Sequence, residues 1–443
     1  MSFPRYPKYK DSGVEWLGEV PEHWALKPLW THFRRVKRVG FDEEQLLSVY
    51  RDHGVIPKAS RDDNFNKPSD DLSVYQLVVP GDLAINKMKA WQGSVAVSEH
   101  RGIVSPAYFV YEALHRESSR YLHYLMRSLR YIAAYLAISK GIRPNQWDME
   151  PQLHSRLPLT IPPLPEQTAI AAFLDKETAK IDALVAEQQR LMELLKEKRQ
   201  AVISHAVTKG LNPHAPLKPS GIEWLGDVPA HWSVVPVKRL VEVKDGTHAT
   251  PAYVDPAEDT YPLITSKDFG ETVICFDEAK HISAADHIEV VRRSNTQQGD
   301  VLMSMIGGNI GKALIVRTDR PLSIKNVALF KTHQSEALAQ YLLFYLQSGL
   351  LDVQIDLLSR GGAQGFMGLG DIRDLVFFKL PPSELETIVD FLKQESATFD
   401  TLTDEAQRAI DLLQERRTAL ISAAVTGQID VCHTTIDIYE HKP

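Results

Sequence analysis

The feature that most constrains this chain is an internal repeat, because the second half restates the motifs of the first half in the same order. Residues 12–24, SGVEWLGEVPEHW, return as residues 220–232, SGIEWLGDVPAHW, with ten of thirteen positions identical. The segment Pro80–Leu83 is likewise matched by Gln298–Val301. A chain of 443 residues with this pattern is expected to fold as two related halves. Two residues that lie 218 positions apart, as Pro80 and Gln298 do, will be called repeat counterparts.

Each half contains the same three parts in the same order: a globular region, a Pro-Pro pair and a charged helical segment. The Pro-Pro pairs are Pro162-Pro163 and Pro381-Pro382. We therefore predict two globular regions, two helical segments and a tail, with boundaries at residues 1–163, 164–210, 211–382, 383–427 and 428–443.

The globular regions are predicted to be mixed α/β. Short apolar runs bounded by Gly, Pro or Asp predict strands at 76–79, 313–316 and 326–330. Apolar and aromatic residues that recur three and four positions apart predict helices at 119–137 and 336–347.

The segments after the Pro-Pro pairs carry a heptad pattern, in which mostly apolar positions alternate four and three residues apart. In the first segment these positions are Ile170, Leu174, Glu177, Ile181, Leu184, Gln188, Leu191, Leu195, Lys198, Val202 and His205. In the second they are Ile388, Leu392, Glu395, Phe399, Leu402, Ala406, Ala409, Leu413, Arg416, Leu420 and Ala423.

A helix of about forty residues is a rod of about 60 Å, and its apolar stripe needs a partner. The economical partner is the other copy, which predicts an antiparallel, intramolecular coiled coil between the two globular regions. The polar Gln188 lies in the middle of the stripe and is expected to fix the register. The alternative is a coiled coil that joins two copies of the chain.

An enzyme acting alone, either a methyltransferase or a nuclease, is the competing class, but the sequence lacks GxxxxGK[ST], HExxH and GxSxG. Phe366–Gly370 is similar to a cofactor-binding turn, yet neither Pro-Pro pair has the flanking residues of an amino-methyltransferase. We interpret that segment as a turn, Gly307–Asn309 as a hairpin turn, and His23 and His231 as packing residues. A pure coiled-coil scaffold is the third class.

Polar loops in which the two halves differ are the candidate binding segments. Arg and Lys pair with guanine in the major groove of DNA, and Asn and Gln pair with adenine. Singly each loop is more simply explained as solvated surface, but as a set in matching positions they predict two readers of different base sequences. The candidate DNA-binding residues are Lys87, Lys89, Gln92, Arg143, Asn145 and Gln146 in the first half, and Lys244, His248, Asn309, Arg360 and Gln364 in the second.

The whole chain resembles the specificity subunit of type I restriction-modification systems. The resemblance is carried by the two EWLG-x-VP-x-HW elements, Asp245–His248, Gly141–Asn145, Gly361–Gln364 and Ile161–Gln167. It implies that the globular regions are target-recognition domains, each reading one half of a bipartite DNA site, and that the helices are a spacer. Leu380–Glu384 is shorter than the matching segment of the first half, which makes helix docking at the second site less secure.

The resemblance also implies partners and their cofactors. The helices would dock two methyltransferase (modification) subunits, which use S-adenosylmethionine to methylate a flipped base, adenine by analogy. Restriction subunits that use ATP and Mg²⁺ would join them. The specificity subunit itself would hold no catalytic centre, no cofactor and no metal.

The net charge of −7 is unevenly distributed along the chain. Residues 1–165 carry +4, residues 166–210 carry zero, residues 211–383 carry −4 and residues 384–443 carry −7. We therefore expect weak DNA binding by the chain alone, with its partners supplying much of the phosphate contact.

The two cysteines, Cys275 and Cys432, form no CxxC pair, and no stretch approaches 18 uninterrupted apolar residues. The polar N-terminus has no signal-peptide pattern, so a cytoplasmic location away from membranes is expected.

Overall fold

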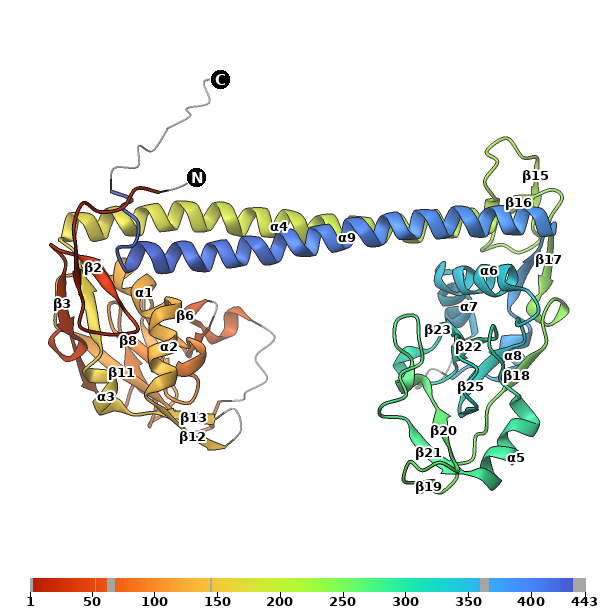
Figure 1. Ribbon diagram of the computed structural model, residues 1–443, viewed down its shortest axis with the longest axis horizontal. Coiled ribbons are helices and arrows are strands. Elements are labelled where there is room, and N and C mark those ends of the chain that lie inside the picture. Colours follow the sequence, from red (N-terminus) through yellow and green to blue (C-terminus); the bar gives the residue numbers. More distant parts are fainter. Residues whose placement is uncertain (1–2, 52, 62–67, 144–145, 359–365, 433–443) are drawn as a thin grey trace. The chain divides into compact units, whose positions relative to one another are not determined.

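The computed structural model divides the chain into two compact units (Figure 1). The first unit comprises residues 1–188 and 408–443, and the second comprises residues 189–407. Each unit holds one globular head and parts of both long helices, so the boundaries drawn above between heads and helices remain a prediction. The residues described are 3–51, 53–61, 68–143, 146–358 and 366–432.

The first head is built on a four-stranded antiparallel sheet in the order β4-β11-β8-β9. Its strands are β4 (Phe33–Val36), β8 (Leu83–Asn86), β9 (Val95–Val97) and β11 (Tyr108–Ala113). Paired strands surround it: β1 (Tyr9–Asp11) with β2 (Glu19–Pro21), β3 (Ala25–Pro28) with β14 (Pro158–Ile161), β5 (Leu47–Tyr50) with β6 (Gly54–Pro57), β7 (Gln76–Val78) with β10 (Gly102–Val104), and β12 (Ser139–Arg143) with β13 (Gln146–Met149). The helices are α1 (Ser119–Arg127), α2 (Leu129–Ala137) and α3 (Pro151–Ser155).

The second head repeats this plan in the order β18-β25-β22-β23. Its strands are β18 (Val243–Asp245), β22 (Val301–Ser304), β23 (Ala313–Ile315) and β25 (Val327–Phe330). Around them lie β15 (Leu217–Pro219) with β16 (Asp227–Pro229), β17 (Ser233–Pro236) with β26 (Val376–Lys379), and a sheet of β19 (Tyr253–Val254), β21 (Lys280–Ser283), β20 (Thr260–Ile264) and β24 (Ser323–Ile324). The helices are α5 (Ala284–Ser294), α6 (Glu336–Gln347), α7 (Leu350–Leu358) and α8 (Leu369–Arg373).

The mixed α/β class is confirmed, as are the strands predicted at 76–79, 313–316 and 326–330 and the helix at 336–347. The helix predicted over 119–137 is wrong in one respect, because it is two helices that meet at Ser128. The Ser128 hydroxyl and N–H both donate to the carbonyl of Leu125, which ends α1.

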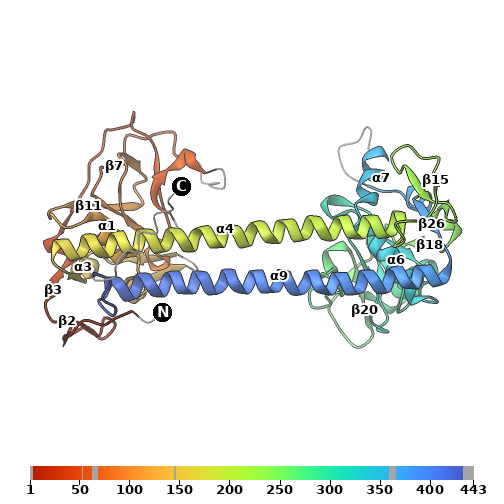
Figure 2. The ribbon, with the colours of Figure 1, turned by 90° about the horizontal axis from the view of Figure 1, so that it is seen from above.

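The two long helices, α4 (Leu164–Lys209) and α9 (Pro382–Val425), lie side by side and run in opposite directions (Figures 1 and 2). In the first unit Arg417 pairs with Asp182 at 2.8 Å, and in the second Arg199 pairs with Asp400 at 2.5 Å. A step forward along α4 from 182 to 199 thus matches an equal step back along α9 from 417 to 400. The prediction that the two helices pack antiparallel is therefore confirmed, and the two ion pairs are in the same register.

One of the two heptad positions was predicted one residue too early. The set Leu174, Ile181, Gln188, Leu195 and Val202 does face inward, as does its counterpart on α9. The second inward set on α4 is Thr178, Val185, Met192, Arg199 and Ala206. The predicted Leu184 and Leu191 are instead 45% and 42% exposed, and Leu402 on α9 is 41% exposed.

Both frames share every seventh residue, and they differ by one position in the other set. The predicted frame follows the leucines at 184, 191 and 402, whereas the helices turn Val185, Met192 and Thr403 inward. The observed frame places Arg199 and Arg417 at the edge of the seam, where each guanidinium reaches an aspartate.

Within the described residues no helix is long and apolar enough to cross a membrane.

Each head is joined to the two long helices through one fully buried tryptophan of the repeated element. In the first unit the Trp24 indole N–H donates to Glu166 in the first turn of α4 at 2.9 Å, and His23 bonds the same carboxylate at 2.9 Å. In the second unit Trp232 and His231 bind Glu384 in the first turn of α9 at 3.1 and 2.7 Å. A carboxylate there also complements the helix dipole.

His23 and His231 thus lie at a structural corner, as expected, but each is exposed and acts there through a hydrogen bond rather than through burial. Glu384 is the repeat counterpart of Glu166 and makes the same two bonds, so the shorter Leu380–Glu384 segment does not weaken the second junction.

The same tryptophans also touch the end of the other long helix. A β-carbon at Gly210, after α4, would lie 3.4 Å from Trp232, and one at Gly427, after α9, would lie 3.2 Å from Trp24. Both glycines have a positive φ, near 70°, which favours glycine at a helix C-terminus. The Tyr121 hydroxyl donates to the Val425 carbonyl at 3.1 Å, so a second contact holds the end of α9.

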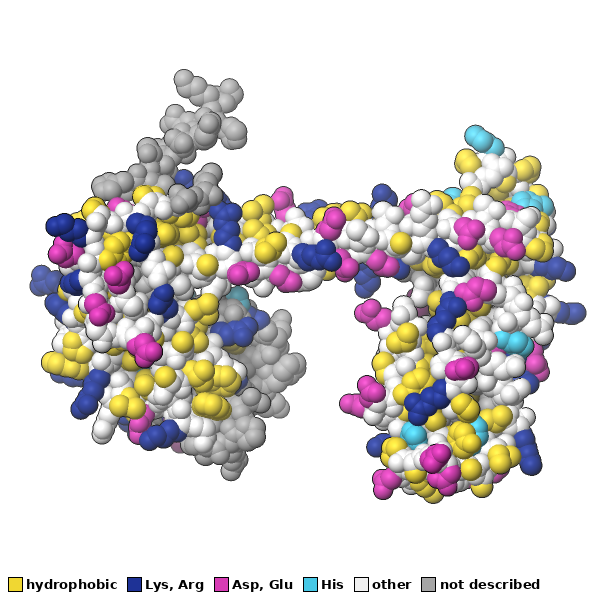
Figure 3. Space-filling model, viewed as in Figure 1, with side chains coloured by type: hydrophobic (Ala, Val, Ile, Leu, Met, Phe, Trp, Pro, Cys, Tyr) yellow, Lys and Arg dark blue, Asp and Glu magenta, His cyan; other side chains and the backbone are white. Residues whose placement is uncertain are grey.

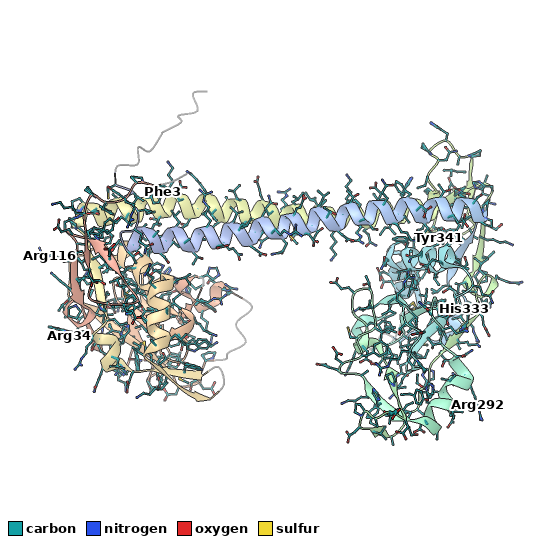
Figure 4. All side chains as sticks on the ribbon, in the orientation of Figure 1. Phe3, Arg34, Arg116, Arg292, His333 and Tyr341 are labelled. Atoms are coloured by element: carbon teal, nitrogen blue, oxygen red, sulfur yellow. The ribbon has the colours of Figure 1, made fainter. Side chains whose placement is uncertain are left out.

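Tyr341 (Figure 4) donates in the same way to the carbonyl of Val207 at 3.0 Å. Burial raises the pKa of Tyr121 and Tyr341 well above its ordinary value, so both remain hydroxyl donors. The core of each head therefore includes the start of one long helix and the end of the other.

The two cores differ at one buried polar pair. Both ring nitrogens of His154 on α3 are buried without a hydrogen-bond partner among the described residues, and so is the hydroxyl of the neighbouring Tyr111. The repeat counterpart of His154 is the buried Ile372, and the strand register matches Tyr111 with Phe330. Burial lowers the pKa of His154 to about 3.

We predict that His154→Ile stabilises the first unit. Removing two unpaired buried nitrogens should raise the free energy of unfolding by about 1–2 kcal/mol at pH 8, measured by urea denaturation. Unfolded histidine takes up a proton below about pH 6.5 while buried His154 does not, so wild-type stability falls from there toward pH 3. The variant should lose less stability over that range.

His115 and His123, whose pKa values burial lowers to about 4 and about 3, will keep part of the acid sensitivity. The reciprocal change Ile372→His should destabilise the second unit. A lower unfolding free energy for His154→Ile at pH 8 would contradict this account.

Candidate nucleic-acid interface

In the first head the two predicted binding segments lie side by side at one end of the central sheet. Lys87, Lys89 and Gln92 follow β8, and the last of them closes a short 3₁₀ turn at Ala90–Gln92. The Met149 N–H of β13 donates to the Lys87 carbonyl at 3.2 Å. The rings of Trp91 and Trp147 also meet, with centroids 5.8 Å apart.

Lys89 is exposed, whereas Lys87 and Gln92 are half-buried. Arg143 closes β12 and Gln146 opens β13, so both belong to the hairpin that meets the Lys87 segment. Asn145 lies outside the described residues. The structure therefore brings the first-half candidates to one place, as far as it describes them.

The second head places the matching segments together in the same way. The Met367 N–H donates to the Met305 carbonyl at 3.0 Å, and these residues are the repeat counterparts of Met149 and Lys87. Asn309 closes the 3₁₀ turn Gly307–Asn309 that links the antiparallel strands β22 and β23. Arg360 and Gln364 lie outside the described residues.

Of the two motifs that resembled functional loops, Gly307–Asn309 is a hairpin turn as predicted, whereas 366–370 is not a turn, because Phe366 forms a β-bridge with Ile306 and Leu369 and Gly370 open α8. Gly307–Asn309 is the connection of the β22–β23 hairpin. In the segment 366–370, Gly368 precedes α8 and donates its N–H to the Asp371 carboxylate at 3.1 Å. In the described ranges no three His, Cys, Asp or Glu side chains gather in a way that could hold a metal ion.

Lys244 and His248 come to the same end of the second head's sheet. Gly246, just after β18, donates to the Val327 carbonyl, and Ser304 at the end of β22 pairs with that same Val327. A β-carbon at Gly246 would collide with the Ile324 carbonyl, which explains the glycine in this turn.

Asp245 organises the turn, with only 2% of its surface exposed. Its Oδ2 lies 2.8 Å from Nε2 of His248, while Nδ1 of His248 lies 3.0 Å from Oδ1 of Asn326. Its Oδ1 accepts from Nε and Nη2 of Arg293 at 2.8 and 2.6 Å. His248 thus uses both ring nitrogens inside the head.

Arg293 was missed by the sequence reasoning. It lies in the last turn of α5, next to the exposed Arg292 (Figure 4), and far along the chain from the carboxylate that it binds. No local pattern joins positions so far apart, although the two adjacent arginines could have drawn attention to this helix end.

Much of the basic run of the first head is paired within the head. Arg34 binds Glu112 at 2.7 Å, and the Arg35 guanidinium lies 4.2 Å from the ring centroid of Phe109. Arg38 binds the buried Asp82 at 2.7 Å. Burial raises the pKa of Asp82, and the bonds from Arg38 and the Val79 N–H oppose that rise. These arginines are therefore less available to a ligand than Lys89.

Gly299-Asp300 is the repeat counterpart of Gly81-Asp82, and its carboxylate likewise holds a turn of the second head. The buried Asp300 accepts from the Gln297 N–H at 2.8 Å, from Lys331 at 2.5 Å and lies 3.0 Å from Nδ1 of His333 (Figure 4). The Asp82 carboxylate fixes the turn before β8, and the Asp300 carboxylate fixes the turn before β22. A candidate segment follows each of these two strands.

Comparison with curated proteins finds similarity over most of the chain. The type I restriction enzyme EcoKI specificity subunit of Escherichia coli K12 is 20% identical, and the alignment covers 93% of this chain and 90% of that protein. The StySPI specificity subunit of Salmonella potsdam is 23% identical over the same shares. The MjaVIII specificity subunit of Methanocaldococcus jannaschii is 22% identical over 70% of each chain. No model of a protein family matches.

Solved structures share the fold. A chain from work on the complex assembly and conformational transition of the type I R-M system matches with a TM-score of 0.66 at 15% identity, over 92% of this chain and 98% of that one. The crystal structure of the HsdS subunit from Thermoanaerobacter tengcongensis matches with a TM-score of 0.50 at 16% identity, over 93% and 98%. The arrangement of two related heads and two long helices is therefore shared with these proteins.

Proposed function

We propose that this chain, a member of the specificity subunits of type I restriction-modification systems, gives its enzyme complex its DNA sequence preference. Specificity subunits are non-catalytic components of these enzymes. Methyl transfer and cleavage belong to the partner subunits, with S-adenosylmethionine in the methyltransferase and ATP with Mg²⁺ in the restriction subunit.

The observation that carries the proposal is that two heads of one plan present different chemistry at equivalent places. The turn after β8 carries Lys87, Lys89 and Gln92, whereas the turn after β22 is Gly307, Gly308 and Asn309. A common frame with different polar groups suits two readers of different half-sites, since base edges are told apart by their donors and acceptors.

The helix pair is proposed to set the number of unread base pairs between the half-sites. The helices contain 46 and 44 residues, and the two repeat-related ion pairs keep them in one antiparallel register. Heads held at a fixed separation along such helices would reach major grooves at a fixed spacing.

The helices are also proposed to dock two methyltransferase subunits through exposed leucines. In the first unit these are Leu184 on α4 and Leu412 on α9, which are 45% and 66% exposed. In the second they are Leu402 on α9 and Leu194 on α4, which are 41% and 51% exposed. Figure 3 shows hydrophobic side chains between charged ones on the surface of the helices.

The repeat relates these two pairs, because Leu402 and Leu412 are the repeat counterparts of Leu184 and Leu194. Since Asp182 faces Arg417, Leu184 and Leu412 lie within about one helical turn of each other along the axis. The same holds for Leu402 and Leu194 beside the Asp400–Arg199 pair. A surface offered twice with the same residues fits two copies of one partner.

Gln92→Ala should relax base discrimination at one position of one half-site by about 1–3 kcal/mol, because an amide that reads a base edge is lost. Lys89→Ala should weaken binding to all sequences and lower the salt slope by about 1. Titration of the complex with cognate and mismatched duplexes separates these outcomes. Lys27→Ala, outside the interface segments, is the control, and an effect of Gln92→Ala on both half-sites would contradict the assignment of one head to each.

Insertion of seven residues after Gln188 and after Ala406 should lengthen the spacer by about three base pairs. One heptad preserves the seam and adds about 10 Å of helix, against about 3.4 Å per base pair. A genome-wide map of methylated sites measures the spacer. The control is an in-place replacement with the inserted sequence, and an unchanged spacer in the insertion variant would reject the ruler.

Leu184→Glu with Leu412→Glu should reduce the bound methyltransferase from two copies to one, since a charge opposes burial of that surface. Leu402→Glu with Leu194→Glu should remove the other copy, and all four changes should remove both. Native mass spectrometry gives the stoichiometry, and circular dichroism checks the helices. Ala186→Glu, at an exposed position of α4, should leave two copies bound, and two copies on the fourfold variant would refute this docking surface.

A further inference from the structure

The Arg293 guanidinium is held by the buried Asp245 in a way that leaves one edge free. Its Nε and Nη2 donate to Oδ1 of Asp245, while Nη1 has no partner in the part of the chain that the structure describes. The side chain is 54% exposed, although its aspartate is buried. The arginine therefore presents donors to solvent from a fixed position, with little rotamer freedom left to lose on binding.

His248 occupies the other oxygen of the same carboxylate. Because both of its ring nitrogens face oxygens of Asp245 and Asn326, its ring has no donor left for a base edge. His248 therefore supports the turn, and the outward contact is left to Arg293.

Other cations lie close to this turn along the sheet. Lys325 forms a β-bridge with Thr247, and Arg373 donates to the Val243 carbonyl of β18 at 2.9 Å, while Lys244 lies 3.4 Å from Glu242. A guanidinium edge that faces solvent is suited to a phosphate oxygen, which accepts charge-assisted hydrogen bonds without encoding sequence.

We propose that Asp245 is a positioning residue of the second head, which fixes Arg293 so that its free edge binds one backbone phosphate of the target DNA. This inference rests on the proposed function and adds to it a residue pair and its ligand. The sheet end that carries Asp245 also carries the Ser304–Asn309 segment, so the phosphate contact would lie beside the proposed base-reading loop.

Asp245→Asn distinguishes a positioning role from a simple charge effect, because the two predict opposite changes in DNA affinity. If Asp245 only added negative charge near DNA, its neutralisation would strengthen binding. If Asp245 fixes Arg293, the loss of a charge-assisted acceptor should weaken binding, by about threefold to tenfold. In an Arg293→Ala background the same change should no longer weaken binding.

Arg293→Ala should lower affinity about tenfold for cognate and mismatched duplexes alike, and should reduce the slope of log affinity against log salt by about 0.9. Arg293→Lys keeps the charge but not the planar edge, so its affinity should lie between those of the unaltered complex and of Arg293→Ala. The measurement is a duplex titration of the complex with its methyltransferase at several salt concentrations.

Asp277→Asn is the matched control, because this carboxylate of the same head is exposed and forms no ion pair with any residue that the structure describes. Thermal unfolding and unchanged discrimination at the first half-site show whether each variant is folded. If Asp245→Asn does not fold, the two Arg293 variants still test the phosphate contact.

The outcomes separate this inference from the proposed function. If the unaltered complex prefers no bipartite duplex, the proposed function fails. If it does prefer one and Arg293→Ala binds as the unaltered complex does, only the inference fails. Relaxed discrimination at one base pair with an unchanged salt slope would overturn the phosphate assignment in favour of a base contact.

Discussion

The contact on which the architecture depends is that between a buried tryptophan and the ends of two helices. Trp24 bonds Glu166 at the start of α4 and packs against Gly427 after α9, while Trp232 does the same with Glu384 and Gly210. Two helices from distant parts of the sequence thus meet on each head at its tryptophan. The entropy of closing such long loops is offset by the shared hydrophobic core of each head.

The repeat made much of this fold predictable, since duplicated motifs with a heptad pattern leave few arrangements. The strands at 313–316 and 326–330 followed from apolar runs and turn residues. The heptad frame did not follow, because the leucines that hydrophobicity favours remain exposed while Arg199 and Arg417 reach aspartates across the seam. The seam between the two helices does not explain the exposed leucines, which instead belong to a second surface of the helices.

The candidate interface was predictable as a set of loops but not as a set of contacts. Matching the two halves located Lys87 and its neighbours, and the structure then joined them to the β12–β13 hairpin through Trp91 and Trp147. The Asp245–Arg293 pair could not be found in this way, because a hydrogen bond between residues far apart in sequence leaves no periodic signal. The turn around His248 was located, but its ring proved to be engaged inside the head.

The tryptophan junction has a further consequence for how such a chain can change. Most of the first head lies between Trp24 and Glu166 in the sequence, and most of the second lies between Trp232 and Glu384, so the bulk of each head is inserted between two residues that touch. Such an insert can vary in length while its two end residues still meet and its core still packs on both helices. Recombination between those points would therefore exchange most of a head in one step and leave the sequence of the helix pair unaltered.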